Sequence, residues 1–319
     1  LVVERLLTRD VRPFRLNLDE FPAQHQLDIT YTNGVPGGML RHMPSETEMA
    51  MTDIGAVWTR KAADFRFLSD DDLGPQERAY ATAETEHMLT SLLLTTQGYW
   101  MNHPLASRSA MWKGEQLQRA ARLGFRVPPS LMTNDGDAVR RFRATVGGEI
   151  IFKALSSPAL GADEVDAADR IVPNLATTMI TDEHDDMLDA LRELPGFFQQ
   201  YIRKRHELRV TVIGEHVFAA RIDSQYDERT RTDYRDFSAE IDYTAERLPA
   251  EIERRCRDYV HSYGLNFGAI DLIFTPDGDY VFLENNPAGQ FLFVEQLVPE
   301  LRMLDAVTDC LINGARGGA

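Results

Sequence analysis

The chain has 319 residues, carries a formal net charge of −16 and contains only two cysteines, Cys256 and Cys310. This length suits two or three packed lobes rather than one small core. The acidic balance argues against a general nucleic-acid or anionic-membrane surface. Two cysteines exclude a disulfide framework and the usual cysteine spacing of zinc sites, which fits a cytoplasmic protein. No apolar run approaches the roughly 18 residues of a membrane helix.

The first third of the chain, residues 1–100, is predicted to form a small α/β lobe. Residues 1–7 have the pattern of the middle of an amphipathic helix, so we expect a strand and a loop to precede them. A short strand is predicted at residues 12–17, and the turn signal at Asn33 and the following glycine predicts a hairpin. Apolar residues at helical spacing between residues 76 and 97 predict a long packing helix.

The middle of the chain, residues 101–196, is predicted to form a central subdomain. A helix is expected at residues 113–124, where a glycine ends it. A second helix is expected to begin at a cap at Thr133 and to end at the glycine pair that follows residue 146. Lys153 lies in the apolar pattern of a strand, where a lysine is rarely left unpaired. It either bridges two acidic side chains or meets a phosphate, and the pattern by itself leaves both interpretations open.

The last part of the chain, residues 197–319, is predicted to form a strand-rich C-terminal subdomain closed by a helix. A hairpin of strictly alternating residues carries Arg209 and Arg221 on its two arms, and we expect them to lie roughly opposite each other. Two opposed cations either hold an anion between them or are neutralised by neighbouring acids, here Glu207 and Asp223.

A second hairpin in this part places two acidic residues side by side. Its turn signal is Asp277-Gly278, and Asp271 and Glu284 are equally distant from it, so their Cβ atoms should lie roughly 4.5–5.5 Å apart. Asn286 points to the same face as Glu284. Two carboxylates and an amide oxygen with no evident compensating charge are ligands that Mg²⁺ prefers. The alternative is one acid in the sheet and one in solvent, with Asn286 capping the next turn.

The remaining patterns are less specific. There is no Walker A loop, no kinase glycine-rich loop and no dinucleotide-binding glycine motif. His25, His87 and His206 show no metal-binding spacing, and each is expected to be structural or exposed. Residues 199–202 alternate between polar and apolar side chains, so their backbone could read an adenine edge or form an ordinary edge strand.

Together these features resemble the ATP-grasp superfamily, and in particular the microviridin or graspetide macrocyclases, which cross-link ribosomally made peptides. The order matches: a lysine at the head of a helix, a strand lysine, a hinge strand, an arginine hairpin and an Asp…Glu-x-Asn-Pro motif. Asn285 and Ala288 depart from the family pattern, in which the first position is usually aliphatic and the second often polar. The stretches that carry the likeness are residues 102–104 with 113–117, 127–129 with 133–135, 207–214 with 221–225, and 282–290.

The resemblance implies an α/β fold in which an N-terminal lobe precedes two lobes that clasp ATP between antiparallel sheets. It also implies roles for the candidate residues. The implied ATP-binding residues, for phosphates and adenine, are Lys113, Lys153, Gln199, Tyr201 and Ile202. The implied ligands of one or two Mg²⁺ ions are Asp271, Glu284 and Asn286. The implied catalytic residues, which would grip the transferring phosphate or orient the acceptor, are Arg209, Arg221 and Asp223.

The activity that the resemblance implies is ATP-dependent activation of a carboxylate. The γ-phosphate would pass to an Asp or Glu side chain of a ribosomal precursor peptide with leader and core, and a Thr, Ser or Lys side chain would then form an ω-ester or ω-amide. The segment around Tyr234 is expected to cover the core peptide. The alternatives are a RimK-like ligase that adds amino acids to a protein or peptide, and a non-catalytic ATP-dependent peptide-binding protein. The family likeness further implies a homodimer.

Overall fold

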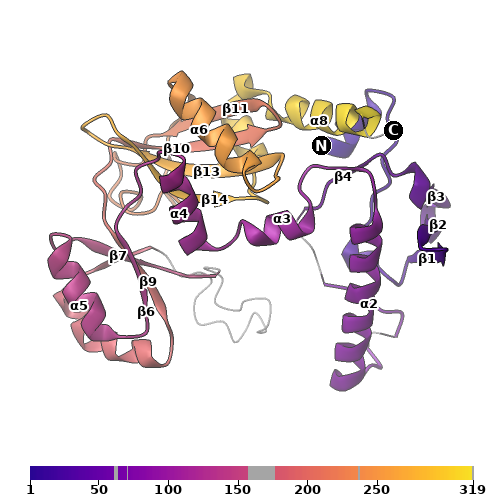
Figure 1. Ribbon diagram of the computed structural model, residues 1–319, viewed down its shortest axis with the longest axis horizontal. Coiled ribbons are helices and arrows are strands. Elements are labelled where there is room, and N and C mark those ends of the chain that lie inside the picture. Colours follow the sequence, from indigo (N-terminus) through magenta and orange to yellow (C-terminus); the bar gives the residue numbers. More distant parts are fainter. Residues whose placement is uncertain (61–63, 70, 157–176, 236–237, 318–319) are drawn as a thin grey trace.

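The computed structural model describes residues 1–60, 64–69, 71–156, 177–235 and 238–317 (Figure 1). The two larger sheets of these residues have four and five strands, and both are antiparallel. None of the helices in the described part of the chain is long and apolar enough to cross a membrane. The prediction of a mixed α/β fold built on antiparallel sheets is therefore confirmed.

The N-terminal part is a three-stranded sheet with a long helix packed against it (Figure 1). The predicted hairpin and long helix are confirmed, but the strand predicted at residues 12–17 is wrong, because these residues form no ladder within the described part of the chain. Pro13 removes one of the donors that such a ladder would need. The elements are α1 (Val2–Leu7), η1 (Leu18–Glu20), β1 (His25–Thr32), β2 (Val35–His42), η2 (Met43–Ser45), β3 (Thr47–Ala50), η3 (Met51–Asp53), β4 (Ala56–Val57), α2 (Pro75–Thr95) and β5 (Tyr99–Trp100).

A single buried amide ties the segment after β5 to the five-stranded sheet. The Nδ2 of Asn102 donates to the carbonyls of Phe267 and Pro287, at 2.8 and 2.7 Å. Its Oδ1 accepts from the backbone N–H groups of Asn266 and Phe267, at 3.0 Å each. Because all four hydrogen bonds of this side chain are made, Asn102 satisfies buried backbone groups where one strand begins and another ends. The short helix α3 (Pro104–Ser109) follows it.

The four-stranded sheet has the order β6-β9-β7-β8 and is covered by α5. The helices predicted at residues 113–124 and after Thr133 are confirmed, and the second begins at a cap in which Asp135 accepts from the N–H of Asp137. Because β9 pairs in this sheet, the two sheets divide the chain after Gln200, slightly beyond the predicted boundary; the domain limits themselves stay a prediction. The elements are α4 (Lys113–Arg122), β6 (Ser130–Thr133), α5 (Gly136–Thr145), β7 (Ile150–Lys153), β8 (Thr178–Ile180), η4 (Asp182–Arg192) and β9 (Gly196–Gln200).

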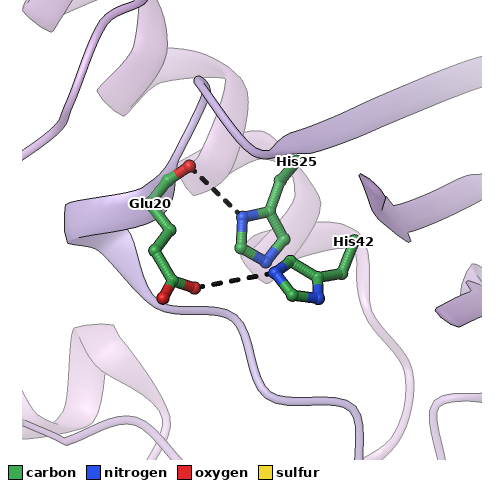
Figure 2. Close-up of side chains that lie close together, drawn as sticks. All are labelled: Glu20, His25 and His42. Carbon is green, nitrogen blue, oxygen red and sulfur yellow. Dashed lines mark hydrogen bonds and ion pairs between the residues drawn. The ribbon is translucent and has the colours of Figure 1, made fainter. Parts of the chain in front are cut away.

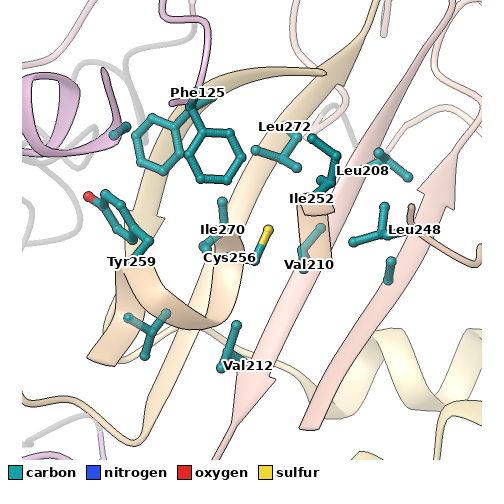
Figure 3. Close-up of a cluster of buried hydrophobic side chains, with 14 of the residues drawn as sticks. Phe125, Leu208, Val210, Val212, Leu248, Ile252, Cys256, Tyr259, Ile270 and Leu272 are labelled. Atoms are coloured by element: carbon teal, nitrogen blue, oxygen red, sulfur yellow. The ribbon is translucent and has the colours of Figure 1, made fainter. Parts of the chain in front are cut away.

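The five-stranded sheet has the order β12-β11-β10-β13-β14 and carries helices on both faces. Figure 3 shows one face, where Val210 and Ile270 pack with Cys256 and Tyr259 of α6. On the other face, Ile213 packs against α7 and α8. The elements are β10 (His206–Ile213), β11 (His216–Ile222), β12 (Tyr243–Ala245), α6 (Ala250–His261), β13 (Phe267–Phe274), β14 (Tyr280–Asn286), α7 (Leu292–Leu297), η5 (Pro299–Leu301) and α8 (Met303–Gly317).

One buried polar side chain on β14 points to the α6 face without satisfying its hydrogen bonds. Asn285 is paired with Ile270, is 3% exposed, and neither polar atom of its side chain has a partner among the described residues. It therefore points away from Glu284, its neighbour on the strand. A Cβ added at Gly268 would lie 2.6 Å from Oδ1 of Asn285, so the strand beside it needs a glycine.

We predict that Asn285→Leu stabilises the protein by about 1–3 kcal/mol, because it replaces two unsatisfied buried polar atoms by methyl groups in a side chain of the same branching. Urea unfolding should show a higher midpoint with an unchanged slope. Asn102→Leu is the matched control: its amide is fully paired, so the same substitution there should destabilise the protein. Destabilisation by both substitutions would contradict the assignment of Asn285.

Candidate functional site

The acidic pair on the last hairpin is adjacent as predicted, but for a different structural reason. Asp271 and Glu284 are direct partners of β13 and β14. The turn, however, is longer than two residues: Phe274 pairs with Tyr280, and Gly278 adopts φ +91°. A register shift next to Asp271 compensates for this longer loop. The pairing of the two acids thus depends on a β-bulge that the sequence did not reveal.

Each of the two carboxylates has a compensating cation beside it. The expectation of no evident compensating charge is therefore wrong. Arg209 on β10 is the direct partner of Asp271 on β13, and its Nη1 donates to Oδ1 of Asp271 at 2.8 Å. The Nζ of Lys113 donates to Oε2 of Glu284 at 2.7 Å. Arg209, Asp271 and Glu284 therefore form one row across three strands, and Lys113 reaches it from α4. The like charges are tolerated because each carboxylate has its own cation.

A buried glutamine on α4 determines where Lys113 lies. Gln116, one helical turn after Lys113, is 3% exposed. Its Nε2 donates to the carbonyl of Asn285 and its Oε1 accepts from the N–H of the same residue, both at 2.9 Å. Residues three apart on a helix share a face, so this clamp on Asn285 brings Lys113 to the adjacent Glu284.

A cavity lies between the four-stranded and five-stranded sheets. The predicted ATP-binding residues Lys153, Gln199, Tyr201 and Ile202 line it together with Asp271 and Glu284. The Nζ of Lys153 donates to Oε1 of Gln199 at 3.2 Å. Among the described residues, Lys153 therefore does not bridge two acids, which was one of the two interpretations that its pattern left open.

The cations around Glu284 keep it ionised. Burial by itself would raise the pKa of Glu284, but three surrounding cations outweigh burial and lower this pKa to about 2. In decreasing order of effect, these cations are Lys113, Lys153 and Arg235. Burial also lowers the pKa of Lys153, while the nearby Glu284 acts in the opposite direction.

Sequence reasoning missed a fourth cation at this site. Arg235 lies with its Nη1 4.0 Å from Oε1 of Glu284 and donates from Nη2 to Oδ2 of Asp233 at 2.6 Å. Thr177 also donates to this Oδ2, at 2.8 Å, and so links the two sides of the cavity. From the sequence, the segment around Tyr234 is expected to cover the peptide. Nothing in its local pattern predicts that Arg235 lies beside Glu284.

The structure does not bring two of the predicted catalytic residues to this site. Arg221 pairs with Leu208, while Arg209 pairs with Ala220, so the two arginines lie on opposite faces of the sheet. The expectation that they oppose each other is therefore wrong by one residue of register. The Nη2 of Arg221 lies 2.7 Å from Oδ1 of Asp223, which neutralises it. The proposed neutralisation of Arg209 by Glu207 is also wrong, because Glu207 is paired with the buried Lys204.

In the segment after β9, two of the backbone N–H groups are already used in hydrogen bonds and cannot bind the edge of a planar base. The N–H of Gln200 donates to the carbonyl of Pro129, and the N–H of Tyr201 donates to that of Glu149, both at 2.9 Å. Neither N–H is available to a ligand. The hydrogen bonds of the described residues do not use the N–H of Ile202, which is the remaining donor of this cavity-lining segment.

The oxygen atoms on the cavity side of the hairpin fit a hard divalent cation. Asp271 and Glu284 are opposed, and Asn286 is two residues further along the same face of β14. The Oδ1 of Asn286 accepts from the N–H of Ala288 at 2.9 Å, which holds its carbonyl oxygen in place. Two carboxylates and one amide oxygen are a donor set of the Mg²⁺ type.

We predict that Gln116→Ala lowers turnover mainly by displacing Lys113. It also leaves the buried N–H and carbonyl of Asn285 without their partner, which should cost about 1–3 kcal/mol of stability. Steady-state kinetics should show a reduced kcat in protein that urea unfolding shows to be folded. Gln118→Ala is the control on the same helix, since this residue is exposed and its Oε1 accepts a hydrogen bond from Arg122, away from the acidic hairpin. An unchanged kcat in Gln116→Ala would contradict the positioning role.

The comparisons with known proteins are consistent with this geometry. A family model, the MvdD pre-ATP grasp domain, matches residues 1–108. The chain is similar to the macrocyclase MdnC of Microcystis aeruginosa MRC, solved with precursor peptide MdnA (29% identity, 98% of this chain and 94% of that chain, TM-score 0.83). It is also similar to a RiPP-associated ATP-grasp ligase of Chryseobacterium gregarium, solved with ADP and a leader and core peptide (28%, 98% and 92%, TM-score 0.87).

A third similar structure is the macrocyclase MdnB of Microcystis aeruginosa MRC (27% identity, 98% of this chain and 94% of that chain, TM-score 0.77). No curated protein matches the chain. The three structures share one architecture with this chain over nearly its whole length. The chain therefore has the ATP-grasp fold, its residues 1–108 match the MvdD pre-ATP grasp domain, and it is similar along its length to RiPP-associated macrocyclases and ligases.

Proposed function

We propose that the protein uses ATP and Mg²⁺ to activate Asp or Glu side chains of a ribosomal precursor peptide and joins them to Thr, Ser or Lys side chains of the same peptide. The observation that carries this proposal is the row of Arg209, Asp271 and Glu284, whose two acids line a cavity together with Lys153. Similar proteins solved with ADP and with precursor peptides support both halves of the reaction.

The cations have the number and placement that a triphosphate requires. Four cationic side chains surround the hairpin, and three carboxylates offset them, so the cluster carries one excess positive charge before any ligand binds. The cations are Lys113, Lys153, Arg209 and Arg235, and the carboxylates are Asp271, Glu284 and Asp233. A loose phosphoryl-transfer transition state is stabilised mainly by such positioned charges, with little need for a general base.

Asp271, Glu284 and Asn286 would hold the Mg²⁺. The metal would neutralise charge on the phosphate oxygens. Lys113 and Arg209, which now donate to these two carboxylates, would contact the phosphates with the nucleotide bound. The same side chains thus neutralise the acids without ligand and would bind the nucleotide with it.

The peptide chemistry would proceed in two steps. A carboxylate oxygen of the peptide attacks the γ-phosphorus and ADP leaves, which gives an acyl phosphate. A hydroxyl or amine of the same peptide then attacks the acyl carbon and phosphate leaves, so each cross-link removes one water from the peptide mass. The cavity side of the sheet supplies Arg209 and Arg235 for the departing phosphate. We also expect a homodimer, as the family likeness implied, and a cytoplasmic location, as the cysteine content indicated.

Incubation of the protein with a cognate precursor, ATP and Mg²⁺ should lower the peptide mass by one water per cross-link and release one ADP for each. Mass spectrometry and coupled ADP detection measure both quantities. Glu284→Gln should abolish the loss of peptide mass and the release of ADP, because it deletes the charge of a metal ligand and keeps the shape of the side chain. A mass that rises by whole residues would instead support an amino-acid-adding ligase, and peptide binding without ADP release would support a binding protein.

The two arginines of the first hairpin should behave differently. Arg209→Gln should lower kcat by about 10²–10³-fold, since it removes a buried cation from the row beside Asp271. Arg221→Gln should change kcat much less, because its partner is Asp223 on the opposite face. Single-turnover kinetics with saturating ATP compare the two variants. Equal losses in both would show that Arg221 reaches the reacting groups, as the family likeness implied.

A further inference from the structure

Two histidines of the N-terminal sheet lie close to a glutamate of the helical turn before it. All three are distant in sequence from the proposed nucleotide site. His25 and His42 are direct partners across β1 and β2, and Glu20 lies in η1 just before β1. The possible ligand atoms of the three side chains all lie within 4.8 Å of one another. Figure 2 shows His42 facing the carboxylate of Glu20 and His25 facing the backbone carbonyl of the same residue. The ring centroids are 4.7 Å apart.

Each histidine has one nitrogen engaged and one unused. The Nδ1 of His25 lies 3.4 Å from the carbonyl of Glu20, and the Nδ1 of His42 lies 2.7 Å from Oγ of Ser45. The Nε2 atoms of both rings are buried and have no hydrogen-bond partner among the described residues. His25 is only 3% exposed, so its free nitrogen cannot be satisfied by bulk water. Leaving two such atoms unpaired side by side is costly unless something binds them.

The carboxylate is held in position by its own hydrogen bonds. The Oε2 of Glu20 lies 3.8 Å from Nε2 of His42, too far for a direct hydrogen bond. Asn17 donates from Nδ2 to this Oε2 at 2.9 Å, and Arg15 donates to Oδ1 of Asn17 at 2.7 Å. The contact with Asn17 orients the carboxylate of Glu20. In the same way, the carbonyl of Glu20 orients His25, and Ser45 orients His42. Such outer hydrogen bonds are typical of metal ligands.

We propose that Glu20, His25 and His42 form a binding site for a divalent transition metal, with Zn²⁺ the best fit. Two imidazole nitrogens and a carboxylate oxygen are a common zinc donor set, completed by water or another group in the fourth position. Zinc bonds of about 2.0–2.1 Å in a tetrahedron place neighbouring ligand atoms about 3.3 Å apart. The 3.8 Å between Glu20 and His42 is therefore close to the required spacing.

The metal would cross-link the segment before β1 to the β1–β2 hairpin. Glu20 and His42 are partly exposed, with side-chain exposures of 33% and 24%, so an ion can reach the buried His25 from solvent. This lobe lies beside α2 and apart from the cavity between the larger sheets (Figure 1). The site is thus expected to stabilise the N-terminal lobe rather than to take part in phosphoryl transfer.

Zinc binding to the full chain should be measured in competition with a chromophoric chelator, in the Glu284→Gln background so that the acidic hairpin does not contribute. One equivalent of Zn²⁺ should bind and raise the melting temperature. Glu20→Gln and His42→Gln should each weaken binding by at least about 100-fold, and Ser45→Ala by about 10–100-fold. His87→Gln, an exposed histidine on α2, is the matched control and should bind zinc as the parent does.

Equal zinc affinity in the parent protein and in Glu20→Gln would overturn the proposal. Since His25→Gln could fail to fold, the partly exposed Glu20 and His42 carry the test, and circular dichroism without metal should show both variants to be folded. Replacement of zinc by Co²⁺ gives a second readout: the parent should develop the visible spectrum of a tetrahedral ion with nitrogen and oxygen ligands. An octahedral spectrum, or none, would contradict the site.

Discussion

The organisation of the proposed nucleotide site depends on one unfavourable contact, the placement of Asp271 directly beside Glu284 on adjacent strands. Like charges in this position destabilise a sheet unless other groups compensate. Compensation comes from cations on separate parts of the chain: Lys113 on α4, Arg209 on β10 and Arg235 after β11. Because each of these must reach the same pair of acids, the helix, the strand and the connecting segment converge on one end of the cavity. The site is a consequence of this convergence.

Buried amides keep the acidic hairpin in register with its surroundings. Asn102 binds the backbone where β13 begins and where the chain leaves β14, and Gln116 binds both backbone groups of Asn285. β14 is the edge strand of its sheet, and Gln116 together with a bridge from Arg126 to Val281 occupies its outer side. An edge that would otherwise be open to pairing with another chain is thereby covered. The same contacts that protect the edge position Lys113.

The N-terminal hairpin follows the same physical logic with a different outcome. Register there also brings two polar residues together, His25 and His42. In the acidic hairpin the protein supplies the opposite charges itself. In the N-terminal hairpin the described residues leave two imidazole nitrogens unpaired beside a carboxylate, and a metal ion is the partner whose chemistry fits. The pair was detectable in principle, because His25 and His42 are equally distant from the Asn33-Gly34 turn, as Asp271 and Glu284 are from theirs.

The sequence by itself determined the class of fold, most helices and hairpins, and the hairpin that carries Asp271 and Glu284. Periodicity and turn chemistry are local properties, so they can be read from neighbouring residues. Tertiary structure alone decided the one-residue register that separates Arg209 from Arg221, the bulge that keeps the acids paired, and the arrival of Arg235. It also decided that Glu207 pairs with Lys204. Register, bulges and ion pairs depend on packing between distant segments, which no local pattern encodes.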